Sequence, residues 1–149
     1  EAGGEDRNPW IHIPAGYIKT MVNPSLNWLF ETQPHPKTGN RPIPVPRGKV
    51  LGGSSAINAM LYVRGQAQDY DTWAQMGCRG WSFEDVLPYF KRAEHREQGA
   101  DAYHGQGGPL NVTLPTQRYD ILDKVIAAGG ALGYPMDQDY NGADQSGFH

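Results

Sequence analysis

The sequence predicts an α/β fold in which much of the chain is irregular and the helices are short. Of its 149 residues, 19 are glycine and 12 are proline, so about a fifth of the chain favours turns. Apolar residues recur at helical spacing in residues 83–93 and 121–132. Pro109–Leu114, between them, alternates apolar and polar residues as strands do. The chain is long enough to bury one core, but its composition is rich in loops for a compact domain of this size.

Residues 8–30 are expected to be irregular, because they show no sustained period of a helix or strand. Glu1–Gly4 predicts a turn, and a short helix is expected near Tyr17–Val22. Asn27–Thr32 predicts a short strand, followed by a polar turn over residues 33–40. In Arg41–Pro46 proline alternates with β-branched residues. This pattern predicts an edge strand or an extended segment, because proline has no N–H to donate to a neighbour.

Arg47–Leu61 joins a basic, glycine-rich start to an apolar run of helix formers. Gly52 and Gly53 let another molecule approach the main chain closely. Ser54 or Ser55 is expected to cap a helix that begins here. The free N–H groups and positive dipole end of such a helix favour an anionic ligand. We interpret the segment as a cofactor cradle; a plain turn is the alternative for two adjacent glycines.

After the cradle, Gly65 is expected to end the helix, because glycine adopts the left-handed conformation that terminates helices. Asp69 is expected to cap a short helix that runs to Met76. Asp69 and Asp71 are therefore interpreted as capping and surface charges rather than as acid-base catalysts.

The clearest helix is predicted over residues 83–93. Ser82 and Asp85 resemble a capping box in which Asp replaces Glu. Pro88 falls inside the apolar pattern and should kink the helix or end its first half. Glu94–Gly108, which follows, is polar, charged and rich in glycine, and predicts an exposed loop.

Charge and composition exclude several classes of protein. The net charge is -3 and basic residues do not cluster, which argues against a nucleic-acid or anionic-membrane surface. No apolar run approaches the roughly 18 residues that span a bilayer. Cys78, the single cysteine, excludes an internal disulfide and fits a reducing compartment such as the cytoplasm, without deciding the compartment. The opening Glu1–Gly4, without Met, predicts a fragment of a longer chain.

The histidines do not predict a metal site, because none lies at ligand spacing from another. His95, beside Glu94 and Glu97, is interpreted as part of a solvated helix end. His12, His35 and His104 likewise have no partner at ligand spacing.

Arg47–Met60, followed by Tyr62–Gly65 and Asp69–Trp73, resembles the first signature of the glucose-methanol-choline (GMC) oxidoreductases. The rest of the chain is similar to the choline and alcohol dehydrogenase branch of that family. This second similarity is carried by Gly80–Ser82, Leu87–Phe90, Tyr103–Gly105, Gly107–Leu110, Gly133–Pro135, Asp139–Gly142 and Gly147–Phe148. Together the two cover nearly the whole chain.

The resemblance implies part of a doubly wound FAD-binding domain, in an enzyme that passes a hydride from a primary alcohol to flavin N5. Residues 1–66 would carry the flavin-contacting loop and helix, and residues 67–149 a helical lid and the start of the substrate-side region. In the family the pyrophosphate-binding turn precedes the position of Glu1, and the catalytic histidine lies beyond His149. The chain alone is therefore expected to be inactive, and its partners would be FAD, a small alcohol and the remaining N- and C-terminal parts of the parent enzyme.

The resemblance also assigns cofactor contacts. Glu1 matches the acidic residue that binds the adenosine ribose. Trp28 falls where the family often has a tryptophan near the cofactor, with an ordinary buried aromatic as the alternative. Arg47 and Lys49 would neutralise phosphate charge or serve as solvated loop charges. The other expected contacts lie in the cradle: Gly48, Val50, Leu51, Gly52, Gly53, Ser54, Asn58, Ala59, Met60 and Leu61.

Ile57 distinguishes this chain from some family members, which attach FAD covalently through a histidine at that position. Isoleucine has no nucleophilic atom, so noncovalent FAD is expected. Two other functions stay open: a noncatalytic binding or structural piece of a split assembly, and a parent that is a flavin-bearing hydroxynitrile lyase.

Overall fold

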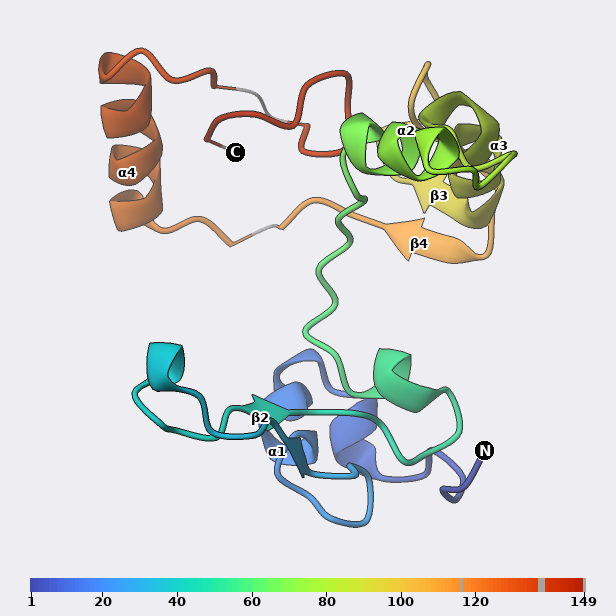
Figure 1. Ribbon diagram of the computed structural model, residues 1–149, viewed down its shortest axis with the longest axis vertical. Coiled ribbons are helices and arrows are strands. Elements are labelled where there is room, and N and C mark those ends of the chain that lie inside the picture. The colour runs from blue at the N-terminus through green and yellow to red at the C-terminus, as the bar shows by residue number, and fades with distance from the viewer. Residues whose placement is uncertain (116, 137–138, 149) are drawn as a thin grey trace. The chain divides into compact units, whose positions relative to one another are not determined.

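The computed structural model describes residues 1–115, 117–136 and 139–148. Packing within the chain divides it into two units, Glu1–Leu61 and Tyr62–His149, each of which is described by itself (Figure 1). The division after residue 66 that the resemblance implies concerns function and stays a prediction. His149 lies outside the described residues.

The first unit is assembled from very short elements. Strand β1 pairs antiparallel with β2, with Phe30 opposite Val45, which confirms the expected strand and edge strand. The expected helix near Tyr17 is confirmed as a single turn. The elements are 3-10 turns Pro9–Ile11, Pro14–Gly16, Pro36–Thr38 and Gly53–Ala56, helix α1 (Tyr17–Thr20), and strands β1 (Phe30–Glu31) and β2 (Pro44–Val45).

The antiparallel pairing of β1 with β2 continues beyond the two strands to the start of the 47–61 loop. Trp28 N–H donates to the Arg47 carbonyl at 2.9 Å, and Lys49 N–H donates to Leu26 at 2.7 Å. Asn27, only 2% exposed, accepts from Arg47 N–H through its side-chain oxygen at 3.0 Å. A buried amide must be hydrogen-bonded, so Asn27 fixes where the loop begins.

The prediction that a helix begins at Ser54 is wrong. The structure has only the 3-10 turn Gly53–Ala56. The Ser54 hydroxyl accepts from Gly48 N–H at 3.1 Å instead of capping a helix. The chain then turns away, because the Asn58 side chain accepts Met60 N–H at 2.9 Å and Met60 takes a left-handed φ of 59°. A local side-chain bond has replaced the helical one.

The core of the first unit is small. Val50 is 0% exposed, Ile57 3% and Leu26 7%, and the partly buried Ile11 and Ala56 pack against them. Burying a side chain of this size stabilises a fold by roughly 1.5–3 kcal/mol. Three side chains bury little apolar surface. The backbone hydrogen bonds around the loop therefore fix much of its conformation.

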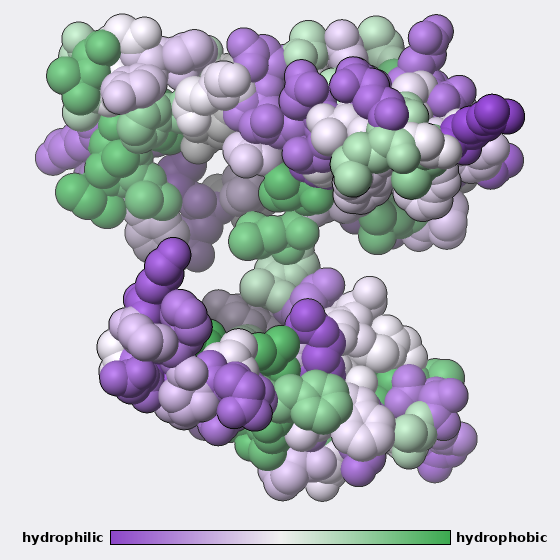
Figure 2. All heavy atoms as spheres, in the orientation of Figure 1, coloured by the Kyte–Doolittle hydropathy of each residue, from purple (hydrophilic) through white to green (hydrophobic). Residues whose placement is uncertain are grey.

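The second unit contains the longer helices. The two amphipathic helices and the strand near residue 110 are confirmed. Strand β4 pairs in parallel with β3, His95 lying opposite Asn111. Within the described residues, every helix is too short or too polar to cross a membrane. The elements are α2 (Ala67–Gln75), α3 (Phe83–Ala93), β3 (Glu94–Arg96), β4 (Leu110–Val112) and α4 (Asp120–Ala131). Helix α4 exposes several large apolar side chains, which are prominent in Figure 2.

Helix α2 begins earlier than expected. Gln66 is its N-cap, and Asp69 lies inside the first turn, where its carboxylate accepts Gln66 N–H at 2.9 Å. Asp69 therefore does cap the helix, as the second partner of a capping box. Gly65 precedes this helix and ends none, so its expected role is wrong. Asp71 accepts Phe83 N–H at 2.9 Å, which ties α2 to the start of α3.

Helix α3 has the predicted capping box. The Ser82 hydroxyl accepts Asp85 N–H, and the Asp85 carboxylate accepts Ser82 N–H, each at 3.2 Å. Pro88 lies inside an unbroken helix, so of the two predicted effects, a kink or an end of the first half, the second is wrong. Proline removes one N–H donor, the one that would reach Glu84 in the first turn, and the remaining bonds hold the helix.

The prediction that Glu94–Gly108 is an exposed loop is wrong near both ends of this segment, where side chains are buried. Glu94 opens strand β3 and is fully buried, and His95 lies in that strand rather than at a solvated helix end. His104 is only 3% exposed. A charged residue is rarely buried unless it is paired, so these positions indicate a polar interior.

Replacing Val50 by alanine is expected to lower the free energy of unfolding by about 2 kcal/mol, because it removes apolar atoms from a fully buried site. Urea denaturation measures the change. Leu61→Ala is the control, since that side chain is 85% exposed; a loss of equal size there would contradict the assignment of the core.

Candidate functional site

The first residues of the chain lie along the 47–61 loop. Gly4 forms a parallel bridge with Val50, and Leu51 N–H donates to the Gly4 carbonyl at 2.8 Å. Gly3 is pressed against Lys49: a Cβ on Gly3 would lie 2.0 Å from the Lys49 carbonyl oxygen. The structure therefore brings the predicted ribose-binding turn and the predicted flavin loop together, and only glycine fits at their contact.

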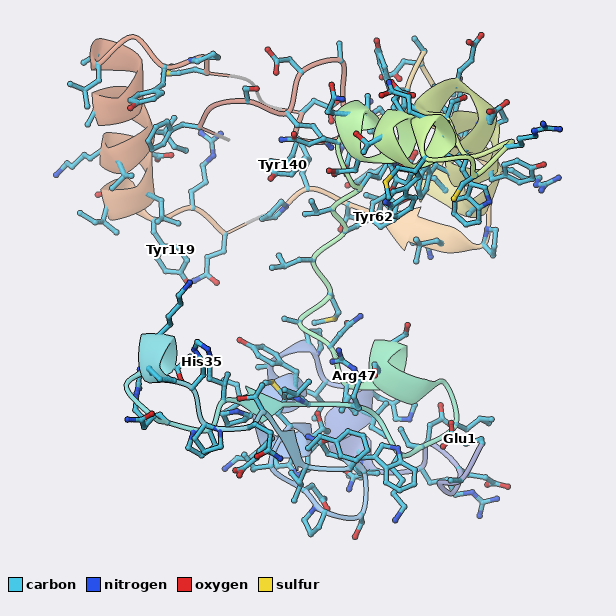
Figure 3. The ribbon with its side chains drawn as sticks, in the orientation of Figure 1. Glu1, His35, Arg47, Tyr62, Tyr119 and Tyr140 are labelled. Carbon is cyan, nitrogen blue, oxygen red and sulfur yellow. The ribbon has the colours of Figure 1, made fainter. Side chains whose placement is uncertain are left out.

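Glu1, predicted to bind the adenosine ribose, and Arg47, predicted to neutralise phosphate charge or to be a solvated loop charge, both belong to the first unit (Figure 3). The Glu1 carboxylate accepts Gly3 N–H through Oε1 at 2.8 Å. Arg47 is exposed, and its Nη1 donates to the Pro46 carbonyl at 2.7 Å. Both side chains keep further polar atoms that a ligand could meet.

Trp28 is half-exposed and stacks on Phe30, with ring centroids 5.8 Å apart. The ammonium of Lys49 lies 4.7 Å from the centre of the Trp28 ring, within the range of a cation–π contact. Trp28 is therefore not the ordinary buried aromatic that was the alternative. Lys49 is partly engaged by this ring.

The glycines of the loop serve different purposes. A Cβ on Gly48 would lie 2.2 Å from the Gly53 carbonyl oxygen and 2.7 Å from Ser54 N, so the loop folds back on itself there. Gly52 and Gly53 have φ of 92° and 60°, values that side chains disfavour. A Cβ on Gly53 would meet nothing within 4 Å. Gly48 makes the turn possible, and Gly53 offers an open stretch of main chain.

The end of the loop presents its side chains outward, whereas Val50 does not. Asn58 and Ala59 are exposed, Met60 is 57% exposed and Leu61 is 85% exposed. Asn58 uses its side-chain oxygen on Met60 N–H, and no described protein group accepts from its Nδ2. Val50 was also predicted to contact the cofactor. Its side chain lies in the core, so it can offer a ligand only main-chain atoms.

A small hollow of about 90 Å³ lies beside the loop within the first unit. Its lining combines aromatic groups from the N-terminal turns with polar and apolar groups of the loop, among them Trp10, Tyr17, Ser55, Asn58 and Met60. The exposed end of the loop therefore adjoins a small hollow lined by aromatic and polar groups.

The second unit is organised around a buried carboxylate. Glu94 Oε2 accepts from Arg64 Nη2 at 2.8 Å and from Gly105 N–H at 2.9 Å, and Glu94 Oε1 lies 3.1 Å from His104 Nδ1. The Arg64 and Glu94 side chains are 2% and 0% exposed. Such a pair is tolerated in the interior only when every charged atom has a partner.

Arg64 also connects segments that are distant in sequence. Its Nη1 donates to the Tyr103 carbonyl at 2.6 Å, and its N–H donates to the Asn141 side chain at 2.8 Å. Asn141 donates in turn to the Tyr62 carbonyl at 2.9 Å, and Gln145 donates to the Arg64 carbonyl at 3.3 Å. These bonds attach residues 139–146 to the start of the unit.

Sequence reasoning missed this network, although one signal was present. Glu94 follows the last turn of α3, where the negative end of the helix dipole disfavours a carboxylate. A carboxylate in that position indicates a cationic partner. The partner Arg64 lies 30 residues away, at a distance that periodicity does not report.

Asp101, His104 and Asp139 each place one potential ligand atom within 4.8 Å of the others. Arg96 lies against both carboxylates, 2.8 Å from Asp101 and 3.3 Å from Asp139. A metal ion would compete with this guanidinium for the same oxygens. The arrangement is that of an ion-pair network.

Partial burial raises the pKa of the Asp101 carboxyl, but hydrogen bonds from the Tyr103 and His104 N–H groups, with the charges of His104 and Arg96, outweigh it. The pKa of Asp101 therefore lies below its ordinary value of 3.8. As the pH falls, the Asp101 carboxylate is protonated in the unfolded chain before it is protonated in the folded chain. The stability that Asp101 contributes is thus present above pH 3.8 and is lost as the pH falls through the folded pKa.

Asp101→Asn is expected to flatten the dependence of unfolding free energy on pH below about pH 4, because the variant has no carboxyl to protonate. Denaturant titrations at a series of acidic pH values measure the slope. Glu97→Gln, at an exposed residue of the same segment, is the control. If both variants gave the same slope as the unchanged chain, the role assigned to Asp101 would be contradicted.

Comparison with known proteins identifies the family. A family profile described as GMC oxidoreductase matches residues 15–149. The chain belongs to the GMC oxidoreductases. It is 46% identical over 148 residues to the oxygen-dependent choline dehydrogenase of Sinorhizobium fredii strain NGR234, covering 99% of this chain and 27% of that protein. The corresponding enzyme of Rhizobium rhizogenes is 45% identical with the same coverage. The chain thus spans about a quarter of the length of these relatives.

Solved structures agree with this assignment. Pyridoxine 4-oxidase from Mesorbium loti matches 99% of the chain and 29% of its own length, with a TM-score of 0.90 and 34% identity. An FAD-dependent oxidoreductase from Chaetomium thermophilum matches 99% of the chain and 27% of its own length, with a TM-score of 0.79 and 28% identity. The resemblance to the family is confirmed, and the chain has mixed helices and strands. Its described residues form two-stranded sheets, without the larger doubly wound sheet.

Proposed function

We propose that residues 47–61 contact the flavin of FAD in an oxidoreductase that oxidises a primary alcohol, choline or a related compound. The observation that carries the proposal is the open main chain at Gly52–Gly53, held in place by Gly48 and Val50 and continued by the exposed residues 58–61. Relatives named choline dehydrogenases support the alcohol, and a structural neighbour named an FAD-dependent oxidoreductase supports the cofactor.

The residues present fit FAD. Asn58 Nδ2 would donate to the flavin ring. The main chain of Ala59 and the side chains of Met60 and Leu61 lie beside Asn58 on the exposed end of the loop. The second oxygen of Glu1 would accept from the ribose hydroxyls. Remaining contacts are proposed for Trp28, Arg47, Leu51 and Ser54.

Binding without a covalent bond is part of the proposal. Ile57 is 3% exposed and packs in the core with Leu26 and Val50, and its side chain has no atom that could attack a flavin. When bound, FAD would accept a hydride from the alcohol at flavin N5.

The chain's own residues would bind and orient the cofactor, and no described residue is proposed as the catalytic base. We propose that the remaining N- and C-terminal parts of the parent enzyme supply the pyrophosphate-binding turn and a base for the alcohol proton. Residues 67–149 would then form a helical lid and the start of the substrate side.

Anaerobic addition of choline or another primary alcohol to the full-length protein tests this function. The proposal expects bleaching of the oxidised flavin absorbance, because two electrons pass to the cofactor. Unchanged flavin absorbance with release of cyanide from a cyanohydrin would indicate a lyase instead. A purified protein that binds no flavin would indicate a noncatalytic piece.

Asn58→Leu in the full-length protein is expected to weaken FAD binding by about tenfold, because one hydrogen bond to the ligand is lost. Titration of the apoprotein with FAD, followed by flavin fluorescence, measures the dissociation constant. Asn111→Leu, at an exposed residue of β4, is the control. Equal FAD affinity in both variants would place the flavin away from Asn58.

A further inference from the structure

Both ring nitrogens of His104 face carboxylates. Nδ1 lies 3.1 Å from Glu94 Oε1, and Nε2 lies 2.9 Å from Asp139 Oδ2. The ring is 4% exposed, so water is not an alternative partner for most of it. An ionised carboxylate only accepts hydrogen bonds, and a neutral imidazole has only one N–H. Two such contacts at once require a proton on each nitrogen.

The surrounding charges are consistent with a cationic ring. Three carboxylates and two guanidiniums form the network, so a protonated His104 brings it to equal numbers of each sign. We propose that His104 is an imidazolium at neutral pH and acts as a protonation-dependent latch that holds residues 139–146 on the second unit. This inference is independent of the flavin proposal. The network comprises Glu94, Asp101, Asp139, Arg64, Arg96 and His104.

The two bonds of the latch are unequal. Glu94 is 0% exposed, so leaving its Oε1 against a nitrogen lone pair would be costly in a site without water. Asp139 is 29% exposed and also contacts Arg96 at 3.3 Å. Loss of the Nε2 proton therefore costs less free energy than loss of the Nδ1 proton. The latch opens at Asp139 and stays closed at Glu94.

Opening at Asp139 would loosen a segment that shapes the unit. Asn141 and Gln145, which follow it, bond to the Arg64 backbone. The same segment lines a hollow of about 290 Å³ together with Phe83 of α3 and the start of α2. The state of one ring proton therefore sets how firmly this wall of the hollow is held.

The groups that surround His104 come from several elements. Tyr103 and Asp101 belong to its own segment, and Lys91 of α3 donates to the Asp101 and Ala102 carbonyls at 2.7 and 3.1 Å. The charged or titratable groups facing the ring, directly or through one partner in the described structure, are Glu94, Arg96, Arg64, Lys91, Asp101, Tyr103 and Asp139.

Two other histidines provide an internal comparison. His95 Nδ1 accepts Gly107 N–H at 2.9 Å, and His35 Nδ1 accepts Lys37 N–H at 3.2 Å. A nitrogen that accepts a backbone N–H carries no proton. These rings must therefore have a bare Nδ1, in contrast to His104.

Nuclear magnetic resonance of ring-labelled histidine in the whole chain tests the latch at about pH 7.5, one unit above the ordinary histidine pKa. The expected spectrum shows two protonated ring nitrogens for His104 and a bare Nδ1 for His95 and His35. A bare nitrogen on His104 in the unchanged chain would overturn the proposal.

Asp139→Asn provides the second measurement. Its amide can donate to Nε2, so His104 should become neutral with its proton on Nδ1, and exchange of the Arg64 amide hydrogen should rise about tenfold as its bond to Asn141 loosens. Asp123→Asn, at an exposed residue of α4, should change neither signal. An imidazolium that persists in Asp139→Asn, with unchanged exchange, would show that Asp139 is not the latch.

Discussion

The second unit depends on the burial of one carboxylate. Glu94 is buried without solvent exposure, and Arg64, Gly105 and His104 each contact one of its carboxylate oxygens. Removing the Arg64 guanidinium would leave a buried charge without its ion-pair partner, which typically costs about 3–5 kcal/mol. The carboxylate thus fixes the strand, the glycine turn and the start of the unit in one arrangement, and Asn141 extends that arrangement to the last described segment.

The first unit is held by main-chain contacts. Its core contains few apolar side chains, and its loop is positioned by the pairing of residues 26–31 with 43–49, by Asn27, and by the bridge from Gly4 to Val50. A loop held by its backbone leaves the side chains at its end exposed. This division of roles suits a surface that meets a large, flat cofactor, which is the function proposed for a chain of the GMC oxidoreductase family.

Prediction from sequence worked where the controlling contacts are local. Helix α3 followed from apolar spacing and the Ser82–Asp85 capping box, and strand β4 from alternation. It did not work where a distant or competing bond decides the structure. Ser54 bonds Gly48 instead of starting a long helix, and Glu94 leaves solvent because of Arg64. The glycines and serines of residues 47–61 predicted a cofactor cradle, and the family resemblance assigned its individual contacts. The open main chain at Gly53 and the burial of Val50 required the structure.

The proposed function requires that the 47–61 loop contacts the flavin through its main chain and through Asn58. An experimental structure of the full-length protein with FAD bound tests it most directly. We expect the flavin ring system within hydrogen-bonding distance of Asn58 or Ala59, beside the open main chain of Gly52–Gly53. A ring system bound elsewhere, with Asn58 and Gly53 facing solvent, would contradict the account.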